Sequence, residues 1–388
     1  MPPKFQEYQP KRIVNIHKHV DGAWFWDKYT AHPYIGCSFG CEFCYSRGGV
    51  YSGNRNPEDF DSVIRVKTNA PGLLKRELSR LESEIIACGD WQEPAEHRYR
   101  LSRKMLEVVL ELGFPLLIIE RSPTVVRDLD IISEINKKAW AGVIFSLSSL
   151  DPRIKRAFEP KSPGIRLRFH AMERISQMGI STGTALMPVL PLVGDDPGSI
   201  EDCVKATKDH GGTFVLGGGL TMNGYQAERT LTAYKRIDPA LESELRSLYG
   251  WNQGEEPRGV PHGDGNRIGR LVRSLCRKHG LSDRMPRYIA PGPRALNKRI
   301  AERLFLKMYS LELDSAEPRR IWSYRKAAWT VDEHPEPLDL LYSRDGIAGL
   351  KRLPGFGDRL AGLVEKWTKI ERRTFDTVDT AYTRGDER

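Results

Sequence analysis

Runs of apolar, β-prone residues alternate along this chain with amphipathic stretches of helical period. The runs end in Gly, Ser or Pro and cover residues 32–36, 84–88, 116–122, 142–149, 181–189 and 213–218. The amphipathic stretches cover residues 73–81, 98–112, 128–139, 166–178 and 200–210. Strands that alternate with helices pair in parallel through helical crossovers. We therefore expect an α/β fold whose chemistry lies at the carboxyl ends of the strands.

The composition favours a soluble globular chain. Its 388 residues predict two or three domains, and 39% of them are hydrophobic against 29% charged. No apolar run reaches the roughly 18 residues of a spanning helix, and the first residues lack the apolar core of a signal peptide. We therefore expect a cytoplasmic protein with no membrane partner. A net charge of +9 is compatible with a polyanionic partner.

Three of the six cysteines, Cys37, Cys41 and Cys44, fall within eight residues. Six unevenly spread cysteines are too few for a disulfide scaffold of this size, and a closed zinc site would want a fourth ligand nearby. Three thiolates on a four-iron cube leave one iron open, and an open iron can bind a substrate. A partial zinc site or a chance cluster is the alternative.

The CxxxCxxC spacing, with Phe43 before the last cysteine, resembles the cluster loop of the radical S-adenosylmethionine (SAM) enzymes. The resemblance implies a 4Fe–4S cluster on the three cysteines and SAM chelated by the open iron. Reduction then cleaves SAM to methionine and a 5′-deoxyadenosyl radical. It also implies an open (β/α)6 partial barrel, six strand–helix units with the cysteine loop after the first strand.

Further strand-end segments narrow the resemblance to the spore photoproduct lyase-like branch of radical SAM proteins. They are residues 88–96, 120–130, 145–149, 159–168 and 187–191, and the likeness spans roughly residues 25–225. The branch implies repair of DNA lesions. It also implies SAM contacts from a set of residues at these ends. The set is Phe43, Tyr45, Arg121, Ser146, Ser148 and Met187.

Several of these residues have a second reading. Arg121 stands where the lyases carry a lysine for the SAM carboxylate, and the alternative is a surface salt bridge. Ser146 and Ser148 share one face of their strand, which points either into the barrel or at the helices. In the lyases a cysteine near Cys88 returns a hydrogen atom to the substrate radical. A buried, inert Cys88 is the alternative. Glu159 and Arg168 form either a structural ion pair or a substrate contact.

Residues 267–307 carry twelve Lys and Arg against two acids. Helical spacing predicts one face for four of these arginines, and we expect this face to contact phosphates. A solvated basic face is the alternative. The four are Arg267, Arg270, Arg273 and Arg277.

The stretch from about 316 to 370 resembles the helix-hairpin-helix domain of X-family DNA polymerases. Its hairpin reads Leu353-Pro-Gly-Phe-Gly357, where Gly355 and Gly357 permit close backbone approach to a phosphate. Arg359 would bind a second oxygen. No lysine follows where those polymerases carry their Schiff-base lysine, so we expect binding of DNA, presumed duplex, without lyase chemistry. A helical hairpin for protein contacts is the alternative.

These patterns predict five segments. They are an N-terminal extension (1–30), a radical SAM partial barrel (31–225), a basic helical region (226–312), a helix-hairpin-helix domain (313–373) and a polar tail (374–388). We expect an enzyme that reverses a base lesion in DNA and takes electrons from a donor such as flavodoxin or ferredoxin. The alternatives are radical SAM modification of RNA or protein, and a non-catalytic DNA-binding iron–sulfur protein.

Overall fold

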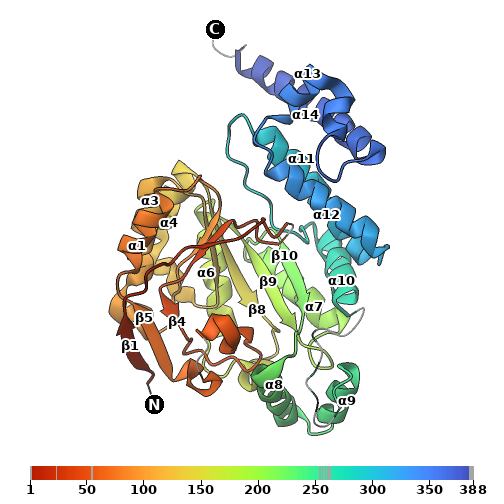
Figure 1. Cartoon of the computed structure of the whole chain (residues 1–388). Coiled ribbons are helices and arrows are strands. Elements are labelled where there is room, and N and C mark those ends of the chain that lie inside the picture. Colours follow the sequence, from red (N-terminus) through yellow and green to blue (C-terminus); the bar gives the residue numbers. More distant parts are fainter. Residues whose placement is uncertain are drawn as a thin grey trace. The chain divides into compact units, whose positions relative to one another are not determined.

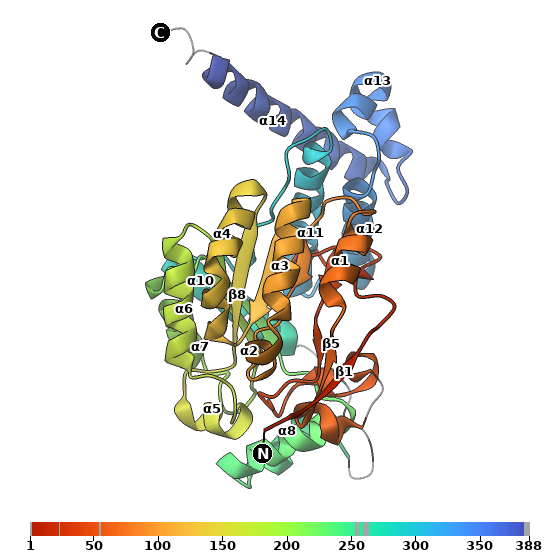
Figure 2. The same ribbon diagram turned by 90° about the vertical axis from the view of Figure 1, so that its left-hand side faces the viewer.

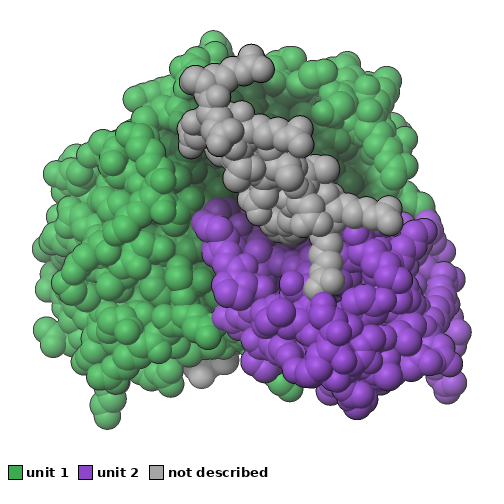
Figure 3. All heavy atoms as spheres, turned by 90° about the horizontal axis from the view of Figure 1, so that it is seen from above, with its two compact units in different colours: residues 1–18, 27–286 green, residues 19–26, 287–388 purple. Residues whose placement is uncertain are grey.

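The computed structural model describes residues 2–22, 24–53, 56–252, 255, 257, 259 and 264–383; side chains are described throughout except at 49, 50, 264, 265 and 372–383. It divides into two compact units, coloured separately in Figure 3. Unit 1 holds residues 1–18 and 27–286, and unit 2 holds residues 19–26 and 287–388. Residues 226–286 therefore group with the expected barrel, and residues 287–312 group with the C-terminal helices.

A seven-stranded sheet, in the order β10-β9-β8-β7-β6-β3-β2, forms the centre of unit 1 (Figure 1). Six of its strands run parallel, and β2 pairs antiparallel at one edge. The sheet is open, because β10 and β2 end the order without pairing to each other. The strands are β2 Asn15–Ile16, β3 Tyr29–Ala31, β6 Ile86–Cys88, β7 Leu116–Glu120, β8 Ala141–Leu147, β9 Ser181–Val189 and β10 Val215–Gly219.

Helices follow the strands and cover one face of this sheet, and Figure 2 shows α3 and α4 side by side over it. These helices are α1 Ala70–Leu78, α3 Leu101–Leu112, α4 Leu129–Lys138, α6 Ile165–Gln177, α7 Pro197–Asp209 and α10 Asp264–His279. Two shorter helices, α2 Ala95–Tyr99 and α5 Pro152–Phe158, pack in other hydrophobic clusters. The predicted α/β architecture, an open (β/α)6 partial barrel followed by helical regions, is confirmed. The five predicted helices begin and end within three residues of α1, α3, α4, α6 and α7.

The main hydrophobic core lies between the sheet and these helices. On β8, the alternate residues Ala141, Val143, Phe145 and Leu147 belong to it together with the apolar sides of the helices. Because successive side chains of a strand point to opposite faces, the other residues of β8 face the interior of the partial barrel. The same alternation places Ile119 on that inner face.

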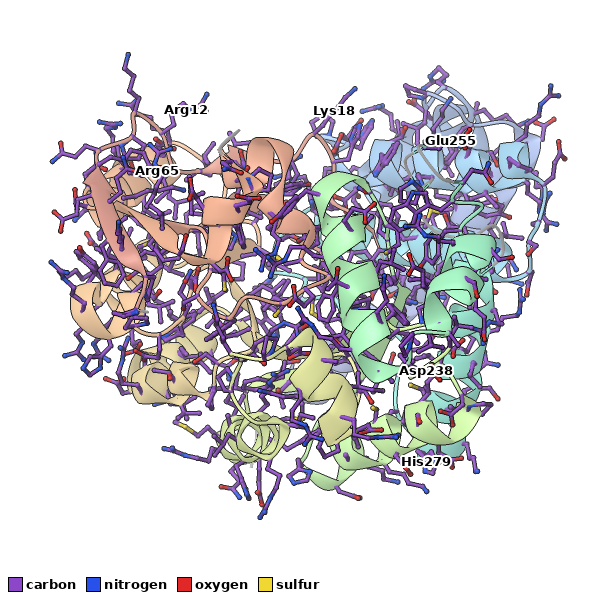
Figure 4. All side chains as sticks on the ribbon, turned by 90° about the horizontal axis from the view of Figure 1, so that it is seen from below. Arg12, Lys18, Arg65, Asp238, Glu255 and His279 are labelled. Atoms are coloured by element: carbon purple, nitrogen blue, oxygen red, sulfur yellow. The ribbon has the colours of Figure 1, made fainter. Side chains whose placement is uncertain are left out.

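The predicted first strand, residues 32–36, does not belong to this sheet. Residues Tyr34–Ile35 form β4 and pair antiparallel with β5 (Val63–Lys67), which also pairs in parallel with β1 (Lys4–Tyr8). The first strand of the partial barrel is the shorter β3. In the small sheet, Arg65, labelled in Figure 4, stands over the ring of Tyr8 at 4.0 Å. Strands β1 and β5 were not predicted from the sequence.

Unit 1 also contains two helices after the sheet and several short 3-10 helices. Helices α8 (Gly224–Ile237) and α9 (Leu241–Leu248) follow β10. Four 3-10 helices lie in loops: η1 Tyr45–Arg47, η2 Gly49–Ser52, η3 Pro57–Asp61 and η4 Pro123–Asp128.

Unit 2 is helical. It contains α11 (Ala295–Leu313), α12 (Pro318–Asp332), α13 (Leu338–Lys351) and α14 (Asp358–Thr383). Helix α13 is broken at Gly346, whose φ of 59° and ψ of −153° are not helical. Helix α14 continues through residues 374–383 of the expected polar tail, and residues 384–388 lie outside the described part. Within the described residues, we find no helix that is both apolar enough and long enough to cross a membrane.

Candidate functional site

The three clustered cysteines lie on a loop that is folded around a buried arginine. Arg47, in η1, donates from Nε and Nη2 to the carbonyl oxygen of Cys41, both at 3.2 Å. Its guanidinium also pairs with Asp61 at 3.3 Å. The loop is tied to its surroundings where the Cys37 amide donates to the Phe60 carbonyl at 3.0 Å. A buried guanidinium needs acceptors for its N–H groups, so these contacts fix the path of the loop.

Helix α8 holds the same loop from the other side. The Gln226 amide donates to the Phe43 carbonyl at 3.0 Å, and the Thr230 hydroxyl donates to the Glu42 carbonyl at 3.2 Å. The buried Glu42 carboxylate pairs with Arg229 at 2.6 Å and with Arg236 at 2.9 Å. Two side chains of α8 therefore bind the backbone between Cys41 and Cys44, and two more bind the Glu42 carboxylate.

The three thiols are free and close enough to interact. Burial raises the pKa of Cys37 well above its ordinary value, and Asp90 and the other two thiols raise it further. Burial likewise raises the pKa of Cys41 to about 12. Buried thiols deprotonate readily only beside a cation, and coordination to a metal supplies one. These thiols fit a metal centre better than a free catalytic thiolate.

The chemistry of the donor set agrees with a cluster, because cysteine thiolates are the usual ligands of iron–sulfur clusters. Within the described residues, no group of three Cys, His, Asp or Glu side chains is placed as the ligands of a single metal ion. The donor set, three cysteines on one braced loop, therefore fits a 4Fe–4S cluster with one open iron.

The inner face of the sheet is not filled by side chains. Ile119 lies on β7 between two hydrogen-bonded strands, yet 41% of its surface is exposed. The Met187 carbonyl accepts from the Arg121 guanidinium and from the Ser146 hydroxyl, both at 3.3 Å. Ser148 is 2% exposed, and its hydroxyl has no hydrogen-bond partner in the described part of the chain. An unpartnered buried hydroxyl beside an open face fits a polar ligand such as SAM.

Arg121 is joined to a buried ionic network. Its guanidinium lies 2.7 Å from the carboxylate of Glu159, which is also 2.6 Å from Arg168. Arg168 donates further to the Ser146 carbonyl at 2.9 Å and the Ser162 hydroxyl at 2.7 Å. The two guanidiniums outweigh the burial cost and hold the pKa of Glu159 at about 2. The Glu159–Arg168 contact is thus a structural ion pair, and it orients Arg121.

The two aromatic residues of the loop lie in different environments. Phe43 is buried against Phe158, with ring centroids 6.3 Å apart, and the Arg121 guanidinium stands 5.2 Å from its ring. Tyr45 is 65% exposed and meets Tyr51 edge to face at 5.4 Å. Contact of either residue with SAM stays a prediction.

Cys88 is placed in the helix-facing core. It is 2% exposed, shares a face of β6 with Ile86, and packs in the same cluster as Trp91. Burial raises the pKa of its thiol to about 12. No recorded contact joins it to Cys37, Cys41 or Cys44 among the described residues. This placement favours the packing alternative, and hydrogen donation stays a prediction.

The segment after Cys88 contributes residues that the sequence reading did not assign. The Gln92 amide accepts from the Ser38 backbone amide at 2.9 Å and donates to the Gly36 carbonyl at 2.8 Å, so it ties β6 to the cysteine loop. Asp90 receives two hydrogen bonds from Gln92. Burial, and then the nearby carboxylate of Glu120, raise the pKa of Asp90 to about 7. The only signal in the sequence was their place at a strand end.

The predicted basic face lies on α10, and part of it is neutralised. Arg267 pairs with Asp195 at 2.5 Å, and Arg273 pairs with Asp283 at 2.9 Å. Arg270 and Arg277 have exposed side chains. The four arginines are therefore not equally available to contact phosphates.

The predicted hairpin lies between α13 and α14. The Phe356 amide donates to the Leu353 carbonyl at 3.0 Å, and Gly355 has a φ of 80°, which favours glycine. A Cβ added at Gly355 or Gly357 would meet nothing within 4 Å, so both face open space. Arg359 is exposed in the first turn of α14, beside the ring of Tyr324 at 6.0 Å.

Comparison with known proteins identifies relatives in sequence and in fold. No protein-family model matches the chain. Among solved structures, a cysteine-to-serine mutant of spore photoproduct lyase superposes with a TM-score of 0.53 at 14% identity. The match covers 72% of this chain and 81% of that one, and it shows that the two chains share a fold.

The sequence relatives are uncharacterized proteins. One from Methanocaldococcus jannaschii is 26% identical over 181 residues, which are 47% of this chain and 66% of the relative. One from Mycobacterium tuberculosis is 30% identical over 228 residues, which are 57% of this chain and 67% of the relative; a protein of Mycobacterium bovis matches equally. The chain belongs to the same family as these mycobacterial proteins.

Proposed function

We propose that this protein is a radical SAM enzyme that acts on damaged DNA. The observation that carries the proposal is the braced loop with three free thiols, which lies beside an inner sheet face lined by Arg121 and the unpartnered hydroxyl of Ser148. Cys37, Cys41 and Cys44 would hold a 4Fe–4S cluster. When bound and reduced, that cluster with SAM supplies a 5′-deoxyadenosyl radical that abstracts a hydrogen atom from a substrate.

The residues of the chain would bind and orient SAM. Ser148 offers a hydroxyl that gains a partner when a polar ligand enters. Arg121, fixed by Glu159, offers a cation for the SAM carboxylate. The apolar side chain of Ile119 would exclude water from the interior of the partial barrel. Phe43, held under Arg121, would support that guanidinium rather than move toward the ligand.

DNA as the substrate is supported by three features. The strand-end segments resemble the photoproduct lyase-like branch, and the chain has the same fold as a spore photoproduct lyase mutant. The hairpin of unit 2 offers two glycines with open space before the first turn of α14, an arrangement that suits a DNA phosphate. Helix α10 adds exposed arginines. Because at least two of its four arginines have carboxylate partners, we assign the larger share of DNA binding to the hairpin.

The setting of the reaction belongs to the proposal as well. Free cysteines and an oxygen-sensitive cluster require a reducing compartment, so we place the protein in the cytoplasm. A one-electron donor such as flavodoxin or ferredoxin would reduce the cluster.

The proposal is tested by anaerobic incubation of the reconstituted protein with SAM, dithionite and ultraviolet-irradiated duplex DNA. Nucleosides are then released and analysed by mass spectrometry. We expect 5′-deoxyadenosine together with loss of one class of photoproduct and recovery of its parent bases. The control is unirradiated DNA. SAM cleavage without any change in the DNA would contradict a DNA substrate and favour RNA or protein modification. Tight DNA binding without SAM cleavage would favour a non-catalytic protein.

A further inference from the structure

Helix α12 of unit 2 (Figure 1) exposes a tryptophan between basic side chains. Trp322 is 49% exposed, although large aromatic side chains are usually covered. Arg319 and Lys326 lie three residues before it and four residues after it, so all three share one face of the helix. Both cations are exposed, and the Arg325 guanidinium stands 5.0 Å from the Trp322 ring.

Trp329, on the same helix, is a tryptophan whose contacts indicate a structural role. Trp329 stacks on His19 with centroids 4.3 Å apart and planes at 13°. Its Nε1 donates to the Val20 carbonyl at 3.3 Å. Trp322 contacts Trp329 edge to face at 6.3 Å, and no hydrogen bond of its own Nε1 is recorded among the described residues. Stacking on His19 and the Nε1 hydrogen bond therefore account for Trp329, and neither kind of contact accounts for Trp322.

The charges of α12 are one-sided. The helix contains four basic residues and one acid, Asp332, which is buried and paired with Arg287 and Lys298. Arg325 pairs with Glu312. Arg319, Arg320 and Lys326 make no ion pair with any described residue. Of these exposed cations, Arg319 and Lys326 share the face of the half-exposed indole, and this combination is complementary to a ligand with anionic groups and flat aromatic rings.

Helix α12 itself contacts the hairpin and the start of α14 within the same unit. The Thr330 hydroxyl of α12 donates to the Pro354 carbonyl at 3.2 Å, and Arg359 of α14 stands 6.0 Å from the ring of Tyr324 on α12. A nucleic acid held at the hairpin glycines would therefore lie close to α12.

We propose that Arg319, Trp322 and Lys326 form a binding site for single-stranded DNA. The indole would stack on one unpaired base, and the two cations would contact the phosphates on either side of it. A paired base offers no free face to a side chain, so the site selects unpaired nucleotides rather than intact duplex. The choice of DNA rests on the proposed function, whereas the stacking geometry does not.

The test uses the full-length protein and two labelled 12-mers in fluorescence anisotropy. One is oligo-dT, and the other is an abasic deoxyribose-phosphate strand of equal charge. We expect Trp322→Ala to weaken oligo-dT binding by roughly 5- to 150-fold and to leave abasic binding unchanged. We expect Lys326→Ala to weaken both and to make the salt slope shallower by about 0.7. The matched controls are Leu340→Ala, which removes a 56% exposed apolar side chain of α13, and Lys369→Ala.

The inference is overturned if Trp322→Ala binds oligo-dT as tightly as the wild type, or if Leu340→Ala loses as much affinity. It is also overturned if the wild type binds both strands equally. Circular dichroism of each variant shows whether unit 2 remains folded, and Trp322→Phe, which keeps an aromatic face, should recover most of the affinity. Binding is measured without cluster or SAM. A failure of the proposed radical chemistry therefore leaves this result intact, and a failure here leaves that chemistry untouched.

Discussion

Removing the charge of Glu159 should destabilise unit 1 strongly, although Glu159→Gln changes the shape of the side chain very little. Its carboxylate is buried between the guanidiniums of Arg121 and Arg168, at 2.7 and 2.6 Å. Glu159→Gln keeps the size of the side chain and removes the charge. The guanidiniums of Arg121 and Arg168 then lack this counter-ion. Breaking a buried ion pair in this way lowers the free energy of unfolding by about 3–5 kcal/mol.

The pKa of Glu159 gives a second estimate and a pH signature. The guanidiniums lower it from the ordinary 4.5 to about 2, which corresponds to roughly 3 kcal/mol of stability at pH 7. A lowered carboxyl pKa stabilises the folded state above pH 4.5, and this stability is lost as pH falls toward 2. The stability gap between the wild type and Glu159→Gln should therefore shrink to about 1.5 kcal/mol by pH 3.

Urea unfolding of the two proteins, followed by circular dichroism at several pH values, measures this gap. The control is Glu134→Gln, whose exposed pair with Lys137 at 2.6 Å should contribute less than about 0.5 kcal/mol. A loss below about 1 kcal/mol at pH 7, or a gap that is the same at pH 3 and pH 7, would refute the reasoning.

Three further predictions concern the site and the hairpin. Glu42→Gln breaks the ion pairs with Arg229 and Arg236, so the reconstituted variant should lose iron to a chelator several times faster than the wild type; equal loss would show that α8 does not brace the loop. Cys88→Ala should keep SAM cleavage and DNA products unchanged if Cys88 only packs, and altered DNA adducts would instead establish hydrogen donation. Gly355→Val should weaken duplex binding without changing its salt slope, whereas Arg359→Ala should make that slope shallower by about 0.9. Wild-type duplex affinity of Gly355→Val would contradict a role of the hairpin in DNA binding.

The sequence predicted the parts of the fold that depend on local pattern. Strand β9 was predicted to the residue, because residues 181–189 form one β-prone run between a glycine turn and a proline-rich end. The first strand was misplaced, because the three residues of β3 carry little signal and the run after them pairs with β5 in another sheet. Short strands are defined by their partners rather than by their own composition.

The same distinction holds for the site. Three cysteines within eight residues are visible in any sequence, so they could be proposed directly as ligands of a cluster, and that assignment stays a prediction. The contacts that brace them are not visible, since Gln226 reaches Phe43 across 183 positions. The face of Cys88 was undecided for a related reason. A strand alternates every residue, so a shift of one position moves a side chain from the barrel interior to the helix layer.

We propose that Cys37, Cys41 and Cys44 hold a cluster that cleaves SAM. Quantifying 5′-deoxyadenosine after anaerobic incubation of the reconstituted protein with SAM and dithionite tests this proposal. We expect one four-iron cluster per chain, 5′-deoxyadenosine from the wild type and Cys203→Ala, and none when any of the three loop cysteines is replaced by alanine. Undiminished 5′-deoxyadenosine from the triple alanine variant, or none from a wild type that carries its full complement of iron, would contradict it.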